Sequence, residues 1–281
     1  MIKLLALDLD GTLLYPKRKL TIMIHKNTKF LRSFVKNGGK VILVSGRNPM
    51  MQSKVEKKIG MKVPFLGCNG SFLMENGEVV EGSPIPNELG LELYLKMRKK
   101  FGILTWLLLD STNEMHMVFH NVNKLTMFAV KMVNRLSMRY KEHITYGEKE
   151  FLKALKEKTY YKLMPVFGID KKAKERALQA LLAVNDLYSD KLFVCNSNNA
   201  LEISALGKNK GVALLKYCKD NGFKNDEVIV AGDSGNDIFM FQKFENSFAM
   251  ANAPAYVKEN AKYVVKRVYE IEKYIRKLEN S

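Results

Sequence analysis

The chain has 281 residues, of which 47% are hydrophobic and 27% charged, a composition typical of soluble globular proteins with one large domain or two modest ones. Its apolar runs are too short to cross a membrane, and its first residues lack the layout of a signal peptide. Its three scattered cysteines fit neither a disulfide framework nor a zinc site. We therefore expect a cytoplasmic protein. The formal net charge of +17 comes from lysines in almost every segment rather than from one basic block, which favours a solvated surface that attracts small anions over nucleic-acid binding.

The first 81 residues alternate between short apolar runs and amphipathic segments. The apolar runs at 2–9, 40–45 and 63–70 predict buried strands. A helix is predicted over 21–36, and a second one opens at Pro49, where a missing N–H does no harm. Strands and helices in this alternation predict parallel pairing with right-handed crossovers, and hence an open α/β sheet.

The pattern changes after about residue 81, where a segment with two prolines leads into mixed hairpins and helices. The runs 103–110 and 114–120 predict an antiparallel hairpin, and 191–205 predicts another. The run 160–168 contains Pro165, which cannot donate to a ladder, so an edge strand is expected there. The remaining predicted elements of this segment are helices over 87–100, 124–138 and 171–184. Together they predict an α+β unit.

The first pattern returns in the last third of the chain. A helix is predicted from Lys210 to its stop at Gly222, followed by a buried strand over 226–233. A helix over 235–244 and short strands at 247–250 and 262–265 complete the predicted elements. The sequence therefore predicts one α/β domain made of residues 1–81 and 207–281, split by an inserted α+β domain over 82–206.

Polar residues stand where the predicted parallel strands end. They are Asp8 and Asp10; Ser45, Gly46 and Arg47; Cys68, Asn69 and Gly70; and Asp233, Asn236 and Asp237. Ligands of open parallel sheets bind beyond the carboxyl ends of the strands, so these groups are expected to converge. Several carboxylates at one edge repel unless a cation compensates them, and an all-oxygen ligand set favours Mg²⁺.

Four short motifs resemble those of the haloacid dehalogenase superfamily, the phosphohydrolases with an aspartate nucleophile. They are "DLDGTL" at 8–13, "VSGR" at 44–47, "NKG" at 209–211 and "GDSGND" at 232–237. The tail segment "MANAPAYVKENA" at 250–261 resembles the Cof-like branch, which carries a large cap inserted where this chain has its insert. The resemblance implies a three-layer Rossmann-like core with an α+β cap domain that selects the substrate.

The resemblance also implies catalytic roles for individual residues. Asp8 matches the nucleophile that forms an aspartyl-phosphate, and Asp10 the general acid that then becomes the base toward water. Ser45 matches the hydroxyl that hydrogen-bonds the transferring phosphoryl group. Lys210 matches the cation that neutralises that group and Asp8, although Lys208, two residues away, is left open as an alternative.

Metal and substrate ligands follow from the same resemblance. The implied Mg²⁺ ligands are Asp8, Asp10 through its backbone carbonyl, Asp233, and Asp237 either directly or through water. The residues expected to contact the substrate are Gly11, Thr12, Gly46, Arg47, Asn69 and Asn236. Gly11 permits a sharp turn whose N–H groups can cradle phosphate, while Arg47 is left open between a phosphate and a structural carboxylate.

Three polar residues of the insert, Glu114, His116 and His120, fall on one face of a predicted strand. The spacing of the two histidines is too long for one zinc ion on a strand, so a polar sheet face is favoured over a metal site. If that face covers the active site, Trp106, Glu114 and His116 become candidates for contact with the leaving group.

The sequence as a whole predicts a Mg²⁺-dependent phosphatase that hydrolyses small phosphomonoesters. A phosphomutase of the same superfamily and a non-catalytic anion-binding or nucleic-acid-binding protein remain alternatives. A dinucleotide oxidoreductase and a P-loop kinase are disfavoured, because neither glycine-rich signature is present. Sugar phosphates, flavin mononucleotide and pyridoxal phosphate all stay open as substrates, and the oligomeric state is not indicated.

Overall fold

The chain forms two compact units in a computed structural model that describes residues 1–16, 22–112, 114–120, 122–123, 125, 127–128, 131–132 and 143–279. The first unit joins Met1–Glu81 to Lys208–Ser281, and the second is Gly82–Gly207. Gly207, expected in the first domain, lies in the second unit. The helix predicted at 124–138 falls largely on residues outside the described ones, as does the predicted helix start at Thr21.

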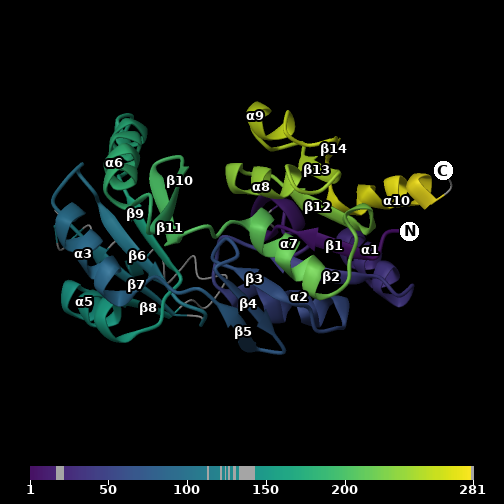
Figure 1. The fold of residues 1–281 in the computed structure, drawn as a ribbon, viewed down its shortest axis with the longest axis horizontal. Coiled ribbons are helices and arrows are strands. Elements are labelled where there is room, and N and C mark those ends of the chain that lie inside the picture. The colour runs from purple at the N-terminus through teal and green to yellow at the C-terminus, as the bar shows by residue number, and fades with distance from the viewer. Residues whose placement is uncertain are drawn as a thin grey trace. The chain divides into compact units, whose positions relative to one another are not determined.

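The first unit is built on an eight-stranded sheet in the order β14-β13-β12-β1-β2-β3-β4-β5 (Figure 1). Its parallel strands are β1 (Leu4–Leu7), β2 (Lys40–Val44), β3 (Phe65–Gly67), β12 (Val228–Gly232), β13 (Asn246–Met250) and β14 (Tyr263–Val265). Strand β1 lies between β2 and β12, so the first strand of the chain pairs with one that follows the insert. This arrangement brings the carboxyl ends of β1, β2 and β12 to one edge.

An antiparallel hairpin extends this sheet and was not predicted. Strands β4 (Phe72–Glu75) and β5 (Glu78–Gly82) follow β3, and β4 pairs antiparallel to it. Asn76 and Gly77 join them with φ of 52° and 90°. An Asn-Gly pair is the strongest short-range hairpin signal in a sequence, so this element could have been found.

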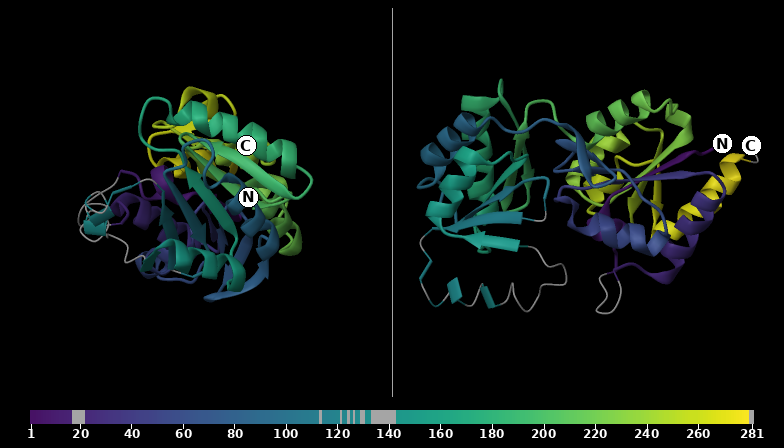
Figure 2. Two further views of the ribbon diagram at one scale, coloured as in Figure 1. Left: turned by 90° about the vertical axis from the view of Figure 1, so that its left-hand side faces the viewer. Right: turned by 90° about the horizontal axis from the view of Figure 1, so that it is seen from below.

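Helices cover both faces of the sheet, as the right view in Figure 2 shows. They are α1 (His25–Lys36), α2 (Gln52–Ile59), α7 (Lys210–Asp220), α8 (Ile238–Phe241), α9 (Ala255–Lys258) and α10 (Ile271–Glu279), with short 3₁₀ turns at Pro49–Met51, Asn225–Glu227, Gly235–Asp237 and Val268–Glu270. Leu4, Ala6 and Val230 of the sheet pack against Leu214 and Met240 of these helices. The three-layer α/β core is therefore confirmed.

The second unit has a six-stranded sheet in the order β10-β11-β9-β6-β7-β8. Its strands are β6 (Thr105–Leu109), β7 (Glu114–Phe119), β8 (His143–Tyr146), β9 (Lys162–Val166), β10 (Leu192–Ser197) and β11 (Ala200–Ala205). The hairpins β6–β7 and β10–β11 are antiparallel, as predicted. Strands β7 and β8 pair in parallel. The mixture confirms an α+β insert.

The prediction that the strand containing Pro165 lies at an edge is wrong. Strand β9 lies inside the sheet, between β11 and β6. The carbonyl of Val166 accepts a bond from Leu104 on the β6 side, whereas the N–H of Phe167 donates to Asn199 on the other side. Because bonding direction alternates along a strand, the missing N–H of Pro165 faces β11. Pro165 therefore removes a hydrogen bond only on the side of β11, and the hydrogen bonds between β9 and β6 are kept.

Three helices cover one face of the second sheet, as the left view in Figure 2 shows. They are α3 (Asn87–Met97), α5 (Glu148–Glu157) and α6 (Ala173–Tyr188). Trp106 is 1% exposed on this face and meets Tyr94 of α3 edge-on. The register pairs Trp106 with Val118 and Leu108 with His116, so Glu114 and His116 share the helix-covered face. The prediction that these residues contact the leaving group is therefore wrong for Trp106 and His116, which are both buried beneath the helices.

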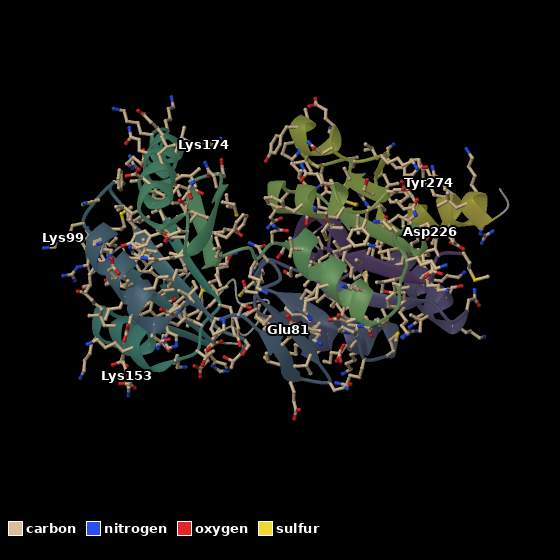
Figure 3. All side chains as sticks on the ribbon, in the orientation of Figure 1. Glu81, Lys99, Lys153, Lys174, Asp226 and Tyr274 are labelled. Carbon is tan, nitrogen blue, oxygen red and sulfur yellow. The ribbon has the colours of Figure 1, made fainter. Side chains whose placement is uncertain are left out.

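Lysine side chains are spread over separate elements, as Figure 3 shows for Lys99, Lys153 and Lys174 on the second unit. Lys153 and Lys174 belong to α5 and α6, whereas Lys99 follows α3. All three are exposed. Among the described residues, no helix combines the length and the apolar character that crossing a bilayer requires.

Leu108→Ala tests the assignment of the covered face. Leu108 is fully buried beneath the helices, so we expect the free energy of unfolding of the second unit to fall by about 2–5 kcal/mol. Leu182→Ala on α6 is the matched control, because Leu182 is 65% exposed, and its cost should stay within about 0.5 kcal/mol. Urea unfolding followed by the fluorescence of Trp106, the single tryptophan, measures both. Equal costs would contradict the assignment.

Candidate active site

Lys210 joins two acids that are far apart in the sequence. Asp8 directly follows β1, and Lys210 is the first residue of α7, whose N-terminus is capped by Asn209. The ammonium Nζ of Lys210 donates to Asp8 Oδ1 at 2.7 Å and to Asp237 Oδ1 at 2.6 Å. All three residues are buried. Lys210, rather than Lys208, is therefore the lysine that contacts the acids.

Asp237 is held in place by the loop that follows β12. Its Oδ2 accepts the backbone N–H groups of Asp233 and Ser234, each at 2.9 Å. Asp233 in turn accepts the hydroxyl of Thr12 at 3.0 Å through Oδ1. Since Thr12 follows β1 and Asp233 follows β12, this hydrogen bond ties the ends of two adjacent strands together.

Three carboxylates come close together at this strand edge. One oxygen from each of Asp8, Asp233 and Asp237 lies within 4.8 Å of the others. Burial raises the pKa of Asp8, and Asp237 and Asp233 add to the rise while Lys210 opposes it. Burial, followed by the charge of Asp237, raises the pKa of Asp233 to about 6. Burial works against the charged Lys210, but Asp237 and Asp8 outweigh it and hold its pKa above the usual range.

The donor chemistry of this acid cluster fits Mg²⁺. Among the described residues, the ion pairs of these three carboxylates are those of Lys210 with Asp8 and Asp237, so the cluster carries excess negative charge that a divalent cation would compensate. Every donor is a hard oxygen, the kind that Mg²⁺ prefers. Burial is the main cause of the raised pKa values of Asp8 and Asp233, and the charge of Asp237 raises both further.

Gly11 lets the loop after β1 approach Asp233 closely. Its φ is +80°, and a Cβ atom there would lie 2.1 Å from Asp233 Oδ2. The Gly11 carbonyl accepts the side-chain amide of Asn252 at 3.2 Å, and that amide lies 3.5 Å from Asp233 Oδ2. No role was predicted for Asn252, although it stands in the tail segment that carried part of the family resemblance.

The Asp10 carboxylate forms an ion pair with Arg47. Its Oδ2 lies 2.5 Å from Nε of Arg47, and both side chains are partly exposed. At this edge of the first sheet, the group of described side chains suited to a metal consists of Asp8, Asp233 and Asp237, without the Asp10 carboxylate. The structure therefore pairs Arg47 with a carboxylate, one of the two roles left open for it.

The other predicted substrate contacts lie at the ends of β2, β3 and β12. Ser45 is buried, its carbonyl accepts the N–H of Asn69 at 3.0 Å, and its hydroxyl accepts the N–H of Arg47 at 3.2 Å across Gly46. The side-chain amide of Asn236 donates to Asn69 Oδ1 at 3.0 Å. The structure thus links three strand ends that the sequence motifs placed apart.

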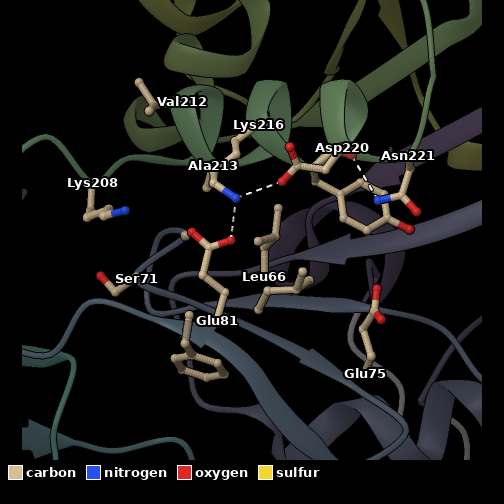
Figure 4. Close-up of a pocket in the computed structure, with 14 residues that line it drawn as sticks. Leu66, Ser71, Glu75, Glu81, Lys208, Val212, Ala213, Lys216, Asp220 and Asn221 are labelled. Atoms are coloured by element: carbon tan, nitrogen blue, oxygen red, sulfur yellow. Dashed lines mark hydrogen bonds and ion pairs between the residues drawn. The ribbon is translucent and has the colours of Figure 1, made fainter.

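A cavity of about 200 Å³ lies between the β4–β5 hairpin and α7, next to this site but outside it (Figure 4). Lys216 of α7 forms an ion pair with Glu81 of β5 at 2.6 Å, and a second one with Asp220 on its own helix at 2.7 Å. Lys208 also lines it. None of the three clustered acids does, so this cavity is not the place where the acids would act.

Gly11→Ala tests the close approach to Asp233. The added methyl group would overlap the carboxylate, so we expect Mg²⁺ to raise the midpoint of thermal unfolding less than in the wild type. Gly38→Ala is the control: its φ is +88°, but nothing lies within 4 Å of the added Cβ. Both variants bear a backbone strain of about 1–2 kcal/mol. The interpretation fails if Gly11→Ala keeps the full response to Mg²⁺.

Lys210→Met tests the buried ion pairs. Removing one partner leaves Asp8 and Asp237 without their counter-charge, which should cost about 3–5 kcal/mol in the free energy of unfolding without Mg²⁺. Lys216→Met removes a lysine with two carboxylate partners that is half exposed, where solvent screens the charges, so its cost should be much smaller. Chemical denaturation measures the free energy of unfolding of both variants. Similar decreases would contradict the inference that burial makes the ion pairs of Lys210 the more important ones for stability.

Comparisons with known proteins show the family of the chain. The family model described as haloacid dehalogenase-like hydrolase matches residues 5–272. The chain is 28% identical over 267 residues to the 5-amino-6-(5-phospho-D-ribitylamino)uracil phosphatase YcsE of Bacillus subtilis, covering 94% of this chain and 89% of that protein. It is 24% identical over 271 residues to the pyridoxal phosphate phosphatase YbhA of Escherichia coli, covering 94% and 92%.

A solved structure shows the same fold over the full length. It is a haloacid dehalogenase-like hydrolase from Bacteroides thetaiotaomicron, with a TM-score of 0.75 and 23% identity, covering 100% of this chain and 99% of that one. Both named relatives are phosphatases. Because the family match spans nearly all of the chain, the chain belongs to the haloacid dehalogenase-like hydrolases, in their Cof-like branch.

Proposed function

We propose that the protein is a Mg²⁺-dependent phosphatase that hydrolyses small phosphomonoesters through an aspartyl-phosphate on Asp8. One observation carries the proposal: Lys210 bridges Asp8 and Asp237 inside the first unit, with Asp233 beside them. A buried cation next to an acidic nucleophile is suited to the negative charge that gathers on a phosphoryl group during transfer.

Asp8 acts as the nucleophile. Lys210 holds Oδ1, so we assign the attack on phosphorus to Oδ2. The new bond between Oδ2 and phosphorus forms as the bond between phosphorus and the leaving alcohol breaks, and Asp10 gives that alcohol its proton. Asp10 then accepts a proton from water, which attacks phosphorus and releases inorganic phosphate and the free Asp8 carboxylate.

Arg47 has to leave Asp10 during this cycle. The ion pair with Arg47 occupies Oδ2 of the Asp10 carboxyl group, which has to reach the leaving alcohol in the first step. A substrate phosphoryl group offers the guanidinium two oxygens in a geometry that it binds well. We therefore propose that the substrate draws Arg47 from Asp10, which couples substrate binding to the readiness of the general acid.

The metal role falls mainly on Asp8 and Asp233. Bound Mg²⁺ would neutralise charge on the phosphoryl oxygens and orient the group for in-line attack. Both oxygens of Asp237 already accept strong donors, one from Lys210 and the other from backbone N–H groups. We propose that Asp237 positions Lys210 and the Asp233 loop, and that any contribution to the metal passes through water. The backbone carbonyl of Asp10 remains a predicted ligand.

Substrate contacts in the first unit are proposed from the loops that meet there. The hydroxyl of Ser45 and the N–H groups around Gly11 and Thr12 would bind phosphoryl oxygens. Gly46, Asn69 and Asn236 shape the same strand ends. The second unit, Gly82–Gly207, is the proposed cap that selects the leaving group.

The relatives support small phosphorylated metabolites as substrates. One is named for a phosphoribitylamino-uracil and another for pyridoxal phosphate. Both compounds are phosphate esters that carry a nitrogen-containing ring system. Pyridoxal phosphate and flavin mononucleotide share both features, and sugar phosphates share the ester, so all three are substrates to be tested. A phosphomutase and a binding protein without catalysis are outcomes of that test.

A phosphate-release assay over these phosphomonoesters tests the proposal, with and without Mg²⁺. We expect release from at least one ester, loss of release on removal of Mg²⁺, and a decrease of at least about 10³-fold in Asp8→Asn, because the nucleophile is gone. Asp10→Asn should lose about 10²–10⁴-fold, the contribution of a general acid. Asp220→Asn, an exposed carboxylate on α7, is the control and should retain full activity.

Three results would contradict the proposal. Full activity of Asp8→Asn would exclude an aspartyl-phosphate on Asp8. Full activity without Mg²⁺ would exclude the proposed role of the metal. Transfer of the phosphoryl group to a second position of the substrate, with no free phosphate, would indicate a phosphomutase. Failure to release phosphate from any ester, together with salt-sensitive binding of random-sequence RNA or DNA, would favour a binding protein.

A further inference from the structure

A second cluster of metal-ligating side chains lies at the closed end of the β6–β7 hairpin, within the second unit. The register pairs Leu108 with His116 and Leu109 with Met115. Side chains alternate between the faces of a strand, so Asp110, Glu114 and His116 all lie on the helix-covered face. One ligand atom from each of these three lies within 4.8 Å of the others.

His116 lacks the hydrogen bonds that a buried imidazole needs. It is 6% exposed, and within the described part of the chain neither Nδ1 nor Nε2 has a hydrogen-bond partner. The nearest carboxylate oxygen that forms an ion contact, Glu114 Oε2, lies 3.8 Å from Nε2, beyond hydrogen-bond reach. Burying a polar group without a partner is costly, so a buried imidazole in this state points to a missing ligand.

Asp110 is buried and already oriented. It is 4% exposed, and Oδ1 accepts both the N–H of Thr112 at 2.7 Å and its hydroxyl at 2.6 Å. These bonds arise in the turn of the hairpin, so they fix the carboxylate before any ion arrives. Preorganised ligands of this kind are what a binding site for a metal requires.

We propose that Asp110, Glu114 and His116 form a binding site for a divalent transition metal, with Zn²⁺ as the fitting ion. One imidazole and two carboxylates suit Zn²⁺, whereas Mg²⁺ takes oxygen ligands and waters. The site is separate from the acid cluster of the first unit, which contains no histidine. It clamps the two strands of the hairpin, and a water completes the ligand set.

Lys158 competes with the metal. Its ammonium forms an ion pair with Glu114, and its side chain is 38% exposed, so it can turn to solvent when an ion binds. His143 pairs with Glu114 in the register of β7 and β8 and is exposed. His120 lies near Tyr94, with 3.5 Å between Nε2 and the phenol oxygen, and does not belong to the cluster. Two histidines four residues apart therefore have different surroundings.

The test is titration of the full-length, metal-stripped protein with Co²⁺ and Zn²⁺ in excess Mg²⁺, which keeps the acid cluster of the first unit occupied. We expect Co²⁺ to give the visible absorbance of a low-coordinate nitrogen- and oxygen-ligated ion, and Zn²⁺ to displace it at one equivalent. Zn²⁺ should also raise the midpoint of thermal unfolding. Asp233→Asn should retain the signal, because it alters only the other cluster.

His116→Gln should weaken Zn²⁺ binding by at least about 100-fold, whereas His120→Gln, the matched control, should bind as the wild type does. Lys158→Met should bind several-fold more tightly, since it removes the competing charge, and this variant tests the proposal even if His116→Gln fails to fold. The proposal is overturned if wild type shows no Co²⁺ absorbance and no Zn²⁺ stabilisation, if both histidine variants bind equally, or if Lys158→Met binds no better.

Discussion

The ammonium of Lys210, buried between Asp8 and Asp237, is the interaction on which the proposed chemistry depends. The two acids come from opposite sides of a long insert, and only the pairing of β1 with β12 brings them within reach of one lysine. A buried charge set of this kind holds together only while all its members are present. The fold and the reaction therefore share one requirement: the first strand must lie beside the strand that follows the insert.

Much of the fold follows from local pattern. Short apolar runs predict buried parallel strands, and the structure has β1, β2 and β12 where these runs lie. The position of the strand with Pro165 could not be predicted, because composition does not reveal toward which neighbour its missing N–H points. The β4–β5 hairpin was missed although Asn76-Gly77 signals it. Periodicity shows that a strand exists, whereas its neighbours depend on distant parts of the chain.

The candidate site divides in the same way. The residue types were predictable, because Mg²⁺ and phosphoryl chemistry call for acids, a lysine and a hydroxyl at strand ends. The arrangement was not. The oxygens of Asp237 accept hydrogen bonds from Lys210 and two backbone N–H groups. Asp10 forms an ion pair with Arg47, and the side chain of Asn252 in the tail segment donates to the carbonyl of Gly11. These distinctions arise from three-dimensional contacts between segments that no motif links.

The interrupted first unit has a consequence for how the protein is made. Residues 82–207 are contiguous and carry their own hydrophobic core, so the second unit can fold as soon as it leaves the ribosome. Strand β1 is synthesised early but lacks its neighbour β12 until more than two hundred further residues have been added. During translation Asp8 therefore lacks its ion pair with Lys210 until the last third of the chain has emerged.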